Sequence, residues 1–226
     1  MRKGTDLITL DTLIELRACK EGREFFAEHH PDGGEYQEVL NAACEHGRPD
    51  FASWLLRELG PTDDVLAVDE IKTDGSVVFA GKIVVGRSIK AGWSIEAGGS
   101  IEAGKSIKAG GWIKAGWSIE AGGWIKAGWS IEAGKSIKAG GWIKAGGSIK
   151  AGWSIEAGGS IEADEWIEAG GSIEADEWIK AGYDSGIYAG LKAKLSDKSN
   201  RTVTAKIKPD NLMCGEFAPL EDRHEN

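Results

Sequence analysis

An uninterrupted six-residue repeat constrains this chain more than any other feature. From residue 71 to residue 179 an aliphatic residue recurs at every sixth position, nineteen times, and only Val77 is not Ile. From Ala91 onward Ala follows two residues after each Ile, and Gly follows at the third place except at Asp164 and Asp176. A short fixed period is typical of stacked-repeat proteins. The sequence therefore predicts a mainly β protein, a β-solenoid.

Alternation within each repeat predicts which side chains face inward. In a strand, Ile and the following Ala lie on one side, whereas the residues before and after Ile lie on the other. Those outer residues are mostly Ser or Trp before Ile and Lys or Glu after it. The glycines are expected to turn the corners, because Gly adopts φ > 0 without steric cost. A right-handed and a left-handed coil both fit this pattern.

The number of repeats in one coil is a separate question. At the fourth position after Ile, alternate repeats are nearly all Gly or nearly exclude Gly, and the two ADEW segments at 163–166 and 175–178 are twelve residues apart. Both observations favour two repeats per coil, which makes a rod roughly 45 Å long. The alternative is a triangular coil of three repeats, in which Lys90, Lys108, Lys126 and Lys144 would align until Glu162 interrupts them.

A triangular coil of hexads resembles the helix of the hexapeptide acyltransferases. In that family the aliphatic residue is usually followed by Gly and the small inward residue precedes the next aliphatic residue by two, whereas here Ala lies two after Ile. All four histidines, His29, His30, His46 and His224, lie outside the repeats. The resemblance is therefore architectural, and no enzyme and no cofactor are predicted.

Three segments follow from the pattern. Residues 1–62 have helical spacing of apolar residues and form a predicted N-terminal cap. They resemble small helical segments found ahead of diverse domains in bacterial and phage proteins, a resemblance that rests on no chemical motif. Residues 68–184 form the solenoid, and residues 185–226 are expected to be a C-terminal cap of short strands and loops, because solenoid ends need covering.

Composition limits the compartment and the partners. The three cysteines, Cys19, Cys44 and Cys214, form no CxxC pair, which argues against a disulfide framework or a zinc site. No segment has the hydrophobic length of a signal peptide or a membrane span. We expect a cytoplasmic protein with no membrane partner. The net charge of −9 argues against a protein that coats nucleic acid.

With two repeats per coil, the outer residues predict a binding stripe. Lysine side chains would form one column on a sheet, two tryptophans would share that sheet, and three more would line its corner. Such a stripe offers cations to an anionic partner and indoles for stacking. The alternative is solvated Lys/Glu variation, with Trp covering a thin Ala core. The residues are Lys114, Lys126, Lys138 and Lys150, then Trp112 and Trp124, then Trp117, Trp129 and Trp153.

Two groups of polar residues are weaker metal-site candidates. Twelve-residue coils would stack Asp164 and Glu165 on Asp176 and Glu177, and calcium accepts such oxygen clusters. However, no calcium-loop spacing accompanies them, and an acidic patch that mimics nucleic acid or solvated turn residues is favoured. His29, His30, Cys44 and His46 lie on predicted helices without ligand spacing. No metal site is predicted.

The function predicted from these features is non-enzymatic binding. By analogy with other solenoids, we expect a phage or mobile-element inhibitor that binds a bacterial macromolecular machine, of the anti-CRISPR or another anti-defence type. The partner is expected to be a protein or nucleoprotein complex, with direct nucleic-acid contact not favoured and a homodimer left open. The alternative is a self-assembling scaffold that resembles bactofilins, against which the two predicted caps argue.

Overall fold

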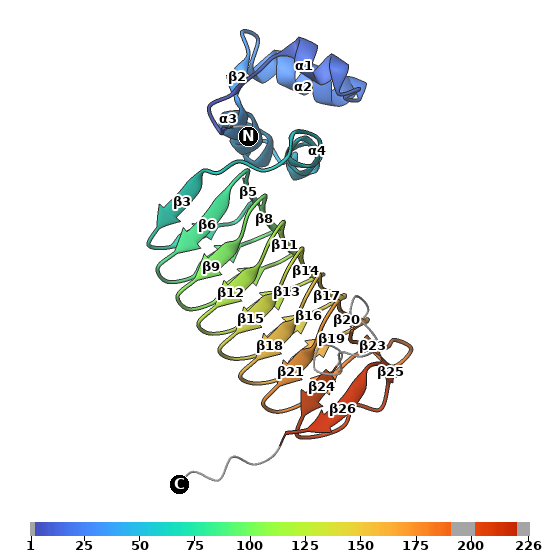
Figure 1. Ribbon diagram of the computed structural model, residues 1–226. Coiled ribbons are helices and arrows are strands. Elements are labelled where there is room, and N and C mark those ends of the chain that lie inside the picture. The colour runs from blue at the N-terminus through green and yellow to red at the C-terminus, as the bar shows by residue number, and fades with distance from the viewer. Residues whose placement is uncertain (1–2, 191–201, 221–226) are drawn as a thin grey trace.

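A rod of stacked parallel strands follows a small helical module (Figure 1). The computed structural model describes residues 3–190 and 202–220. No helix among the described residues has the length and apolar character needed to cross a membrane. The prediction of a mainly β solenoid preceded by helices is confirmed.

Four helices make up most of the N-terminal module. They are α1 (Leu10–Glu15), α2 (Lys20–His29), α3 (Tyr36–Glu45) and α4 (Pro49–Leu59), with a short pair of strands, β1 (Leu7–Ile8) and β2 (Gly34–Glu35). A capping box between Thr9 and Thr12 begins α1, and Pro49 occupies the first turn of α4, where its missing N–H costs nothing. Apolar side chains such as Phe26 and Leu55 are fully buried between the helices.

Each coil of the rod contributes one strand to each of three parallel sheets. Among the described residues these sheets have seven, eight and nine strands. The seven-stranded sheet contains β4 (Ile71–Thr73), β7 (Ile89–Ala91), β10 (Ile107–Ala109), β13 (Ile125–Ala127), β16 (Ile143–Ala145), β19 (Ile161–Ala163) and β22 (Ile179–Lys180). The eight-stranded sheet contains β5 (Val77–Phe79), β8 (Ile95–Ala97), β11 (Ile113–Ala115), β14 (Ile131–Ala133), β17 (Ile149–Ala151), β20 (Ile167–Ala169), β23 (Ile187–Tyr188) and β25 (Leu212–Cys214). The nine-stranded sheet contains β3 (Val65–Val68), β6 (Lys82–Val85), β9 (Ile101–Ala103), β12 (Ile119–Ala121), β15 (Ile137–Ala139), β18 (Ile155–Ala157), β21 (Ile173–Ala175), β24 (Thr202–Ala205) and β26 (Glu216–Pro219).

The coil is eighteen residues long, so the preference for two repeats per coil is wrong. Ile113 of β11 pairs with Ile95 of β8 and with Ile131 of β14, each eighteen residues away. The six strand spacings across the seven-stranded sheet, at about 4.8 Å each, give a repeat rod of roughly 29 Å. The three-repeat alternative is the one the structure adopts.

The core consists of three Ile and three Ala per coil. Every repeat isoleucine between Ile95 and Ile173 is 0% exposed, and the Ala two residues after each is at most 7% exposed. Fully burying one such aliphatic side chain stabilises a fold by about 1.5–3 kcal/mol. One hydrophobic cluster contains described residues from Ile83 to Ala189 together with Val203 and Ala205, which is why so thin a rod can fold.

The repeat glycines lie at the corners as predicted, but the positive φ expected of them is wrong. None of the described glycines between Gly75 and Gly186 has a positive φ. Instead, a Cβ at Gly110 would lie 2.0 Å from the carbonyl oxygen of Gly92, and one at Gly128 would lie 1.9 Å from that of Gly110. Gly fits at these two corners because the backbones of neighbouring coils approach closely there.

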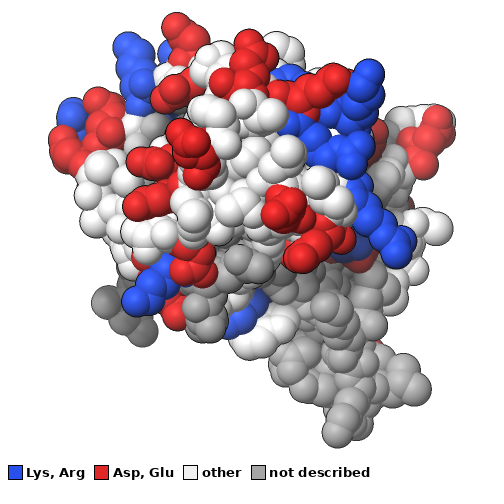
Figure 2. Space-filling model, turned by 90° about the horizontal axis from the view of Figure 1, so that it is seen from above, with Lys and Arg blue, Asp and Glu red and all other residues white. Residues whose placement is uncertain are grey.

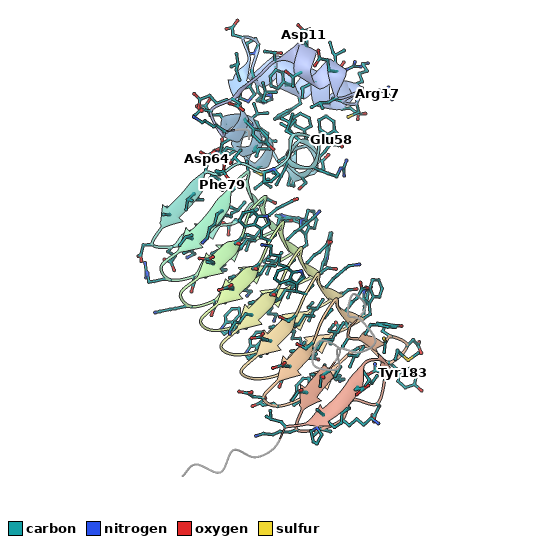
Figure 3. The ribbon with its side chains drawn as sticks, viewed as in Figure 1. Asp11, Arg17, Glu58, Asp64, Phe79 and Tyr183 are labelled. Carbon is teal, nitrogen blue, oxygen red and sulfur yellow. The ribbon has the colours of Figure 1, made fainter. Side chains whose placement is uncertain are left out.

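The helical module packs directly on the first coil. The side-chain amide of Gln37 in α3 donates to the Val78 carbonyl at 2.9 Å and accepts from the Ala80 amide at 2.9 Å. Val78 and Ala80 belong to the same apolar cluster as the helices. Ser53 of α4 donates to the carboxylate of Glu96. Figure 3 shows the neighbouring Asp64 and Phe79 at this junction.

The described C-terminal strands continue the sheets. Val203 of β24 pairs with Ile173 of β21 and with Phe217 of β26. Tyr183, fully exposed, lies near this end of the rod (Figure 3). Residues 191–201 and 221–226 of the predicted C-terminal cap lie outside the described residues.

Candidate functional site

The predicted lysine column does not exist. Lys114 and Lys150 belong to the eight-stranded sheet, Lys126 to the seven-stranded sheet and Lys138 to the nine-stranded sheet. Three of the four are paired with acids: Lys114 lies 3.9 Å from Glu96, Lys138 3.2 Å from Glu156 and Lys150 3.0 Å from Glu168. The prediction fails because it rested on a twelve-residue coil.

A different set of lysines is stacked in register on the seven-stranded sheet. Each pairs with the next along the sheet, so their side chains repeat at the strand spacing. We call these five residues the lysine row: Lys72, Lys90, Lys108, Lys126 and Lys144. The row then meets Glu162, the register partner of Lys144.

Most of the lysine row carries no internal counter-charge. Among the described residues, only Lys144 of the row forms an ion pair, with Glu162 at 2.9 Å. The hydrogen bond to Glu162, together with its charge, raises the pKa of Lys144 above its ordinary value. Lys72, Lys90 and Lys108 are exposed. The row therefore presents positive charge outward along much of one face.

On the eight-stranded sheet, the charges of the outer side chains alternate from strand to strand. Acidic and basic residues alternate at the corresponding position, so each of the two lysines lies between two glutamates. The order is Glu96, Lys114, Glu132, Lys150 and Glu168. This face neutralises itself.

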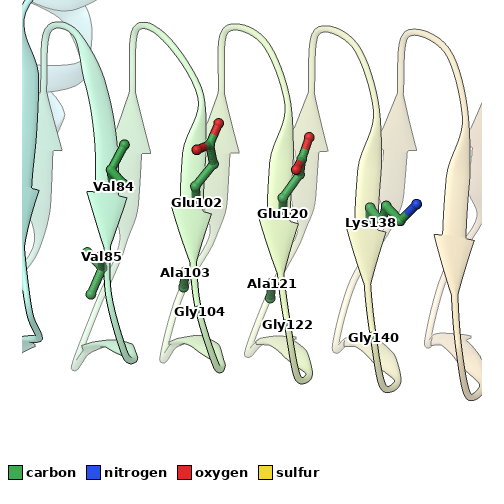
Figure 4. Close-up of a pocket in the computed structure, with 10 residues that line it drawn as sticks. All are labelled: Val84, Val85, Glu102, Ala103, Gly104, Glu120, Ala121, Gly122, Lys138 and Gly140. Atoms are coloured by element: carbon green, nitrogen blue, oxygen red, sulfur yellow. The ribbon is translucent and has the colours of Figure 1, made fainter.

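The nine-stranded sheet is mainly acidic. Its outer column reads Glu102, Glu120, Lys138, Glu156 and Glu174. Figure 4 shows the first part of the column, with Glu102, Glu120 and Lys138 on successive strands beside a groove of about 500 Å³. Lys82 is 2.7 Å from Glu102. Seen from above, side chains of both signs surround an uncharged area (Figure 2).

The predicted tryptophans divide among sheets and corners. Trp124 lies on the seven-stranded sheet and stacks on Trp142, with ring centroids 5.0 Å apart and planes 5° apart. Trp112 lies on the eight-stranded sheet and packs against Trp129 at 5.6 Å. They therefore do not share one sheet, and Trp129 does not share a corner with the remaining two.

Trp117 and Trp153 share a corner, two coils apart. The ammonium of Lys135, on the coil between them, lies 4.9 Å from the Trp117 ring and 5.6 Å from the Trp153 ring. Sequence reasoning missed Lys135 and Trp142, although an eighteen-residue alignment brings both into place.

The two acidic segments are also separated. Asp164 and Glu165 lie at the corner after β19, whereas Asp176 and Glu177 lie at the corner after β21. Each glutamate has a structural partner, because Ser148 donates to Glu165 at 2.7 Å and Ser160 donates to Glu177 at 2.6 Å. Their expected stacking is therefore wrong. In the part of the chain that the structure describes, no group of three or more His, Cys, Asp or Glu could hold a metal ion.

Two histidines of the helical module contact each other, whereas Cys44 lies elsewhere. The rings of His29 and His46 lie 4.2 Å apart. Cys44 instead faces the first coil, and burial, the largest cause, raises its pKa to about 11. A thiol that stays protonated at neutral pH is a poor nucleophile.

Comparison with known proteins identifies only the helical module. Residues 1–59 match the family model described as YdhT N-terminal domain. No curated protein and no solved structure matches the chain. The solenoid faces must therefore be interpreted from their own chemistry.

Proposed function

We propose that this chain is a non-enzymatic binding protein whose lysine row receives an acidic segment of a protein partner. The observation that carries the proposal is the in-register stacking of Lys72, Lys90, Lys108 and Lys126 without an ion-pair partner among the described residues. Like charges directly opposite each other across strands are destabilising. The alternating face of the eight-stranded sheet indicates that the fold does not require such a row.

The dimensions and surroundings of the row favour an extended acidic polypeptide. Five lysines at about 4.8 Å span roughly 19 Å, the length of about six residues of extended chain. The stacked pair Trp124 and Trp142 lies on the same sheet, and aromatic side chains commonly anchor protein interfaces. The acidic nine-stranded sheet and the net charge of −9 disfavour a nucleic acid that wraps around the rod.

Inhibition of a bacterial defence complex stays a prediction from the sequence, and the function we propose is binding alone. The bactofilin-like alternative requires coils to stack end to end. The helices packed on Val78 and Ala80 oppose stacking at the first coil, so assembly through that end is the less favoured function.

The test compares two matched sets of three lysines. A fluorescent 20-residue poly-glutamate probe is titrated at low salt with the wild type, with Lys72/Lys90/Lys108→Gln and with Lys114/Lys138/Lys150→Gln. Both variants lose the same formal charge. We expect about tenfold weaker binding for the first set, at about 0.2–1 kcal/mol per exposed charge pair, and less than a twofold change for the second.

Two outcomes would contradict the proposal. An equal loss in both variants would mean that the probe senses net charge and not the row. Tighter binding of an oligo-thymidine probe than of poly-glutamate, lost in the first variant, would identify nucleic acid as the partner instead.

A further inference from the structure

A column of indoles on the seven-stranded sheet has one missing member. The residues immediately before Ile on four successive strands are Trp124, Trp142, Ser160 and Trp178. Trp124 and Trp142 stack nearly parallel, which leaves the other face of Trp142 directed along the column toward Ser160. We call the space between Trp142 and Trp178 the indole slot.

The indole slot is a pocket that is open to solvent. It has a volume of about 460 Å³. Ser160, only 6% exposed, lies at its base, whereas Trp142 and Trp178 are 37% and 36% exposed. The charged residues along its wall are Lys126, Lys144, Glu162 and Glu177.

Elsewhere on the rod, a lysine ammonium occupies the space between two indoles that are also two coils apart. Trp117, Lys135 and Trp153 have the same eighteen-residue steps as Trp142, Ser160 and Trp178. There the Lys135 ammonium lies between two indoles, within 5.6 Å of both ring centroids. Two indoles two coils apart therefore leave room for one cation, which contacts both π faces.

Ser160 leaves the indole slot open. Its hydroxyl is turned to the carboxylate of Glu177, at 2.6 Å. A serine side chain is too short to lie between two rings, and this hydrogen bond places a negative group beside the opening instead. Among the described residues Glu177 has no ion-pair partner within 4.0 Å.

A carboxylate beside the slot favours a positive guest. The charged residues that line the slot are Lys126, Lys144, Glu162 and Glu177, and Lys180 is the register partner of Glu162. Lys144 is neutralised by Glu162 at 2.9 Å, and Lys126 lies on β13, two strands away from the strand that follows Ser160. At the level of Ser160, a guest therefore meets the carboxylate of Glu177, which has no ion-pair partner among the described residues.

A planar cation fits better than a spherical one. The Trp124–Trp142 stack presents a flat face to the slot, and guanidinium stacks on indoles while its N–H fork donates to carboxylates. We propose that the indole slot binds the guanidinium of an arginine side chain of a protein partner. This inference does not depend on acid binding by the lysine row, although Lys126 and Lys144 of the row also line the slot.

Nuclear magnetic resonance of the indole N–H groups tests the slot directly. The Trp142 and Trp178 signals, assigned with single Trp→Phe variants, are followed while N-acetyl-arginine amide is added. We expect saturable shifts at both signals. N-acetyl-citrulline amide, which has nearly the same shape without the charge, should bind at least fivefold more weakly. Absence of shifts with arginine, or equal affinity for citrulline, would overturn the proposal.

Variants at the slot distinguish binding there from binding elsewhere on the rod. Ser160→Lys places an ammonium between two indoles, as Lys135 does, so we expect at least tenfold weaker arginine binding with both indoles present. Wild-type affinity in this variant would contradict the proposal. Trp178→Ala removes a partly exposed side chain and provides the same test if Ser160→Lys does not fold.

Two control variants are matched to the slot. Lys135→Ser should leave the response of Trp142 and Trp178 unchanged. Lys72/Lys90/Lys108→Gln should also bind arginine as the wild type does, even though it is expected to lose poly-glutamate. A failed slot and a failed lysine row therefore give different results, because each is read with its own probe and its own variants.

Discussion

At the residue scale, the repeat glycines are set by contact between coils. A Cβ at Gly128 would lie 1.9 Å from the Gly110 carbonyl oxygen, whereas one at Gly141 would have no neighbour nearer than 3.4 Å. These two glycines occupy the third and the fourth position after Ile, respectively. Gly128 is therefore sterically closed to a side chain, whereas Gly141 is not.

This difference predicts unequal effects of two otherwise identical substitutions. Gly128→Ala should destabilise the protein by about 2–4 kcal/mol, because two backbones must move apart. Gly141→Ala should cost less than about 1 kcal/mol. Thermal unfolding, monitored by circular dichroism, measures which of the two variants is less stable. Equal melting temperatures for the two variants would contradict the steric account.

Cys44 reports on the junction between the helical module and the first coil. Burial is the main reason that its pKa is raised from the ordinary 9.0 to about 11, so the thiol is protonated at pH 8. Alkylation by iodoacetamide at pH 8 should be much slower at Cys44 than at the exposed Cys19. Comparable rates would mean that the junction opens freely.

The same shift has a consequence for stability. A thiol whose folded-state pKa is raised imposes no penalty below its unfolded pKa and disfavours the folded state above it. The contribution of Cys44 is therefore constant below about pH 9 and falls between about pH 9 and pH 11. Cys44→Ala should remove that part of the pH dependence, as measured by denaturant unfolding across this range.

At the element scale, the charge pattern of each sheet decides whether the outer side chains of neighbouring strands attract or repel one another. Lys108 pairs in register with Lys90 and Lys126, whereas Glu132 pairs with Lys114 and Lys150. The first strand column repels itself, and the second attracts itself. Because the stacked lysines of the seven-stranded sheet repel one another, they do not stabilise the fold, and we attribute them to binding.

Opposite effects are expected when the two patterns are exchanged. Lys108→Glu should raise stability by about 0.2–1 kcal/mol, because it creates an alternating column. Glu132→Lys should lower stability by a similar amount. Both differences should shrink at 1 M salt, where screening is strong. A loss of stability in Lys108→Glu would show that the row is not repulsive.

The strands were predictable from the sequence, but their stacking was not. Inward Ile and Ala follow from alternation within three residues, a local property. The number of repeats per coil depends on which distant strands pair. At the corner after each strand of the seven-stranded sheet, bulky and small residues alternate along the stack, as in Trp93, Gly111 and Trp129. That pattern recurs every 36 residues, and 36 is a multiple of both twelve and eighteen.

The same ambiguity misplaced the candidate site. The sequence indicated the right residue types, lysines and tryptophans on outer faces, but the twelve-residue coil divided them among wrong columns. Of the four predicted lysines, only Lys126 belongs to the lysine row, and of the two tryptophans predicted to share its sheet, Trp112 and Trp124, only Trp124 does. The signal that could have found the row was present in the three-repeat alignment of Lys90, Lys108, Lys126 and Lys144.

At the scale of the whole molecule, a helical module covers one end of a three-faced rod. One face is basic, one alternates and one is mainly acidic. The tryptophans of the repeats gather on the first two faces and at the corners, whereas the described strands of the nine-stranded sheet carry none on their outer surface. The molecule therefore presents chemically distinct surfaces at fixed positions, as a rigid binding protein requires.

The assignment of residues to faces depends on the eighteen-residue coil, and one crosslink tests it. The hydroxyls of Ser136 and Ser154, eighteen residues apart, lie 3.2 Å from each other on the nine-stranded sheet. In a background with the native cysteines replaced by Ala, Ser136→Cys/Ser154→Cys should form an intramolecular disulfide on mild oxidation, detected by mass spectrometry of the protease digest. Ser136→Cys/Ser148→Cys, twelve residues apart, should not. Crosslinking of the second pair and not of the first would contradict the three-faced rod and both binding proposals.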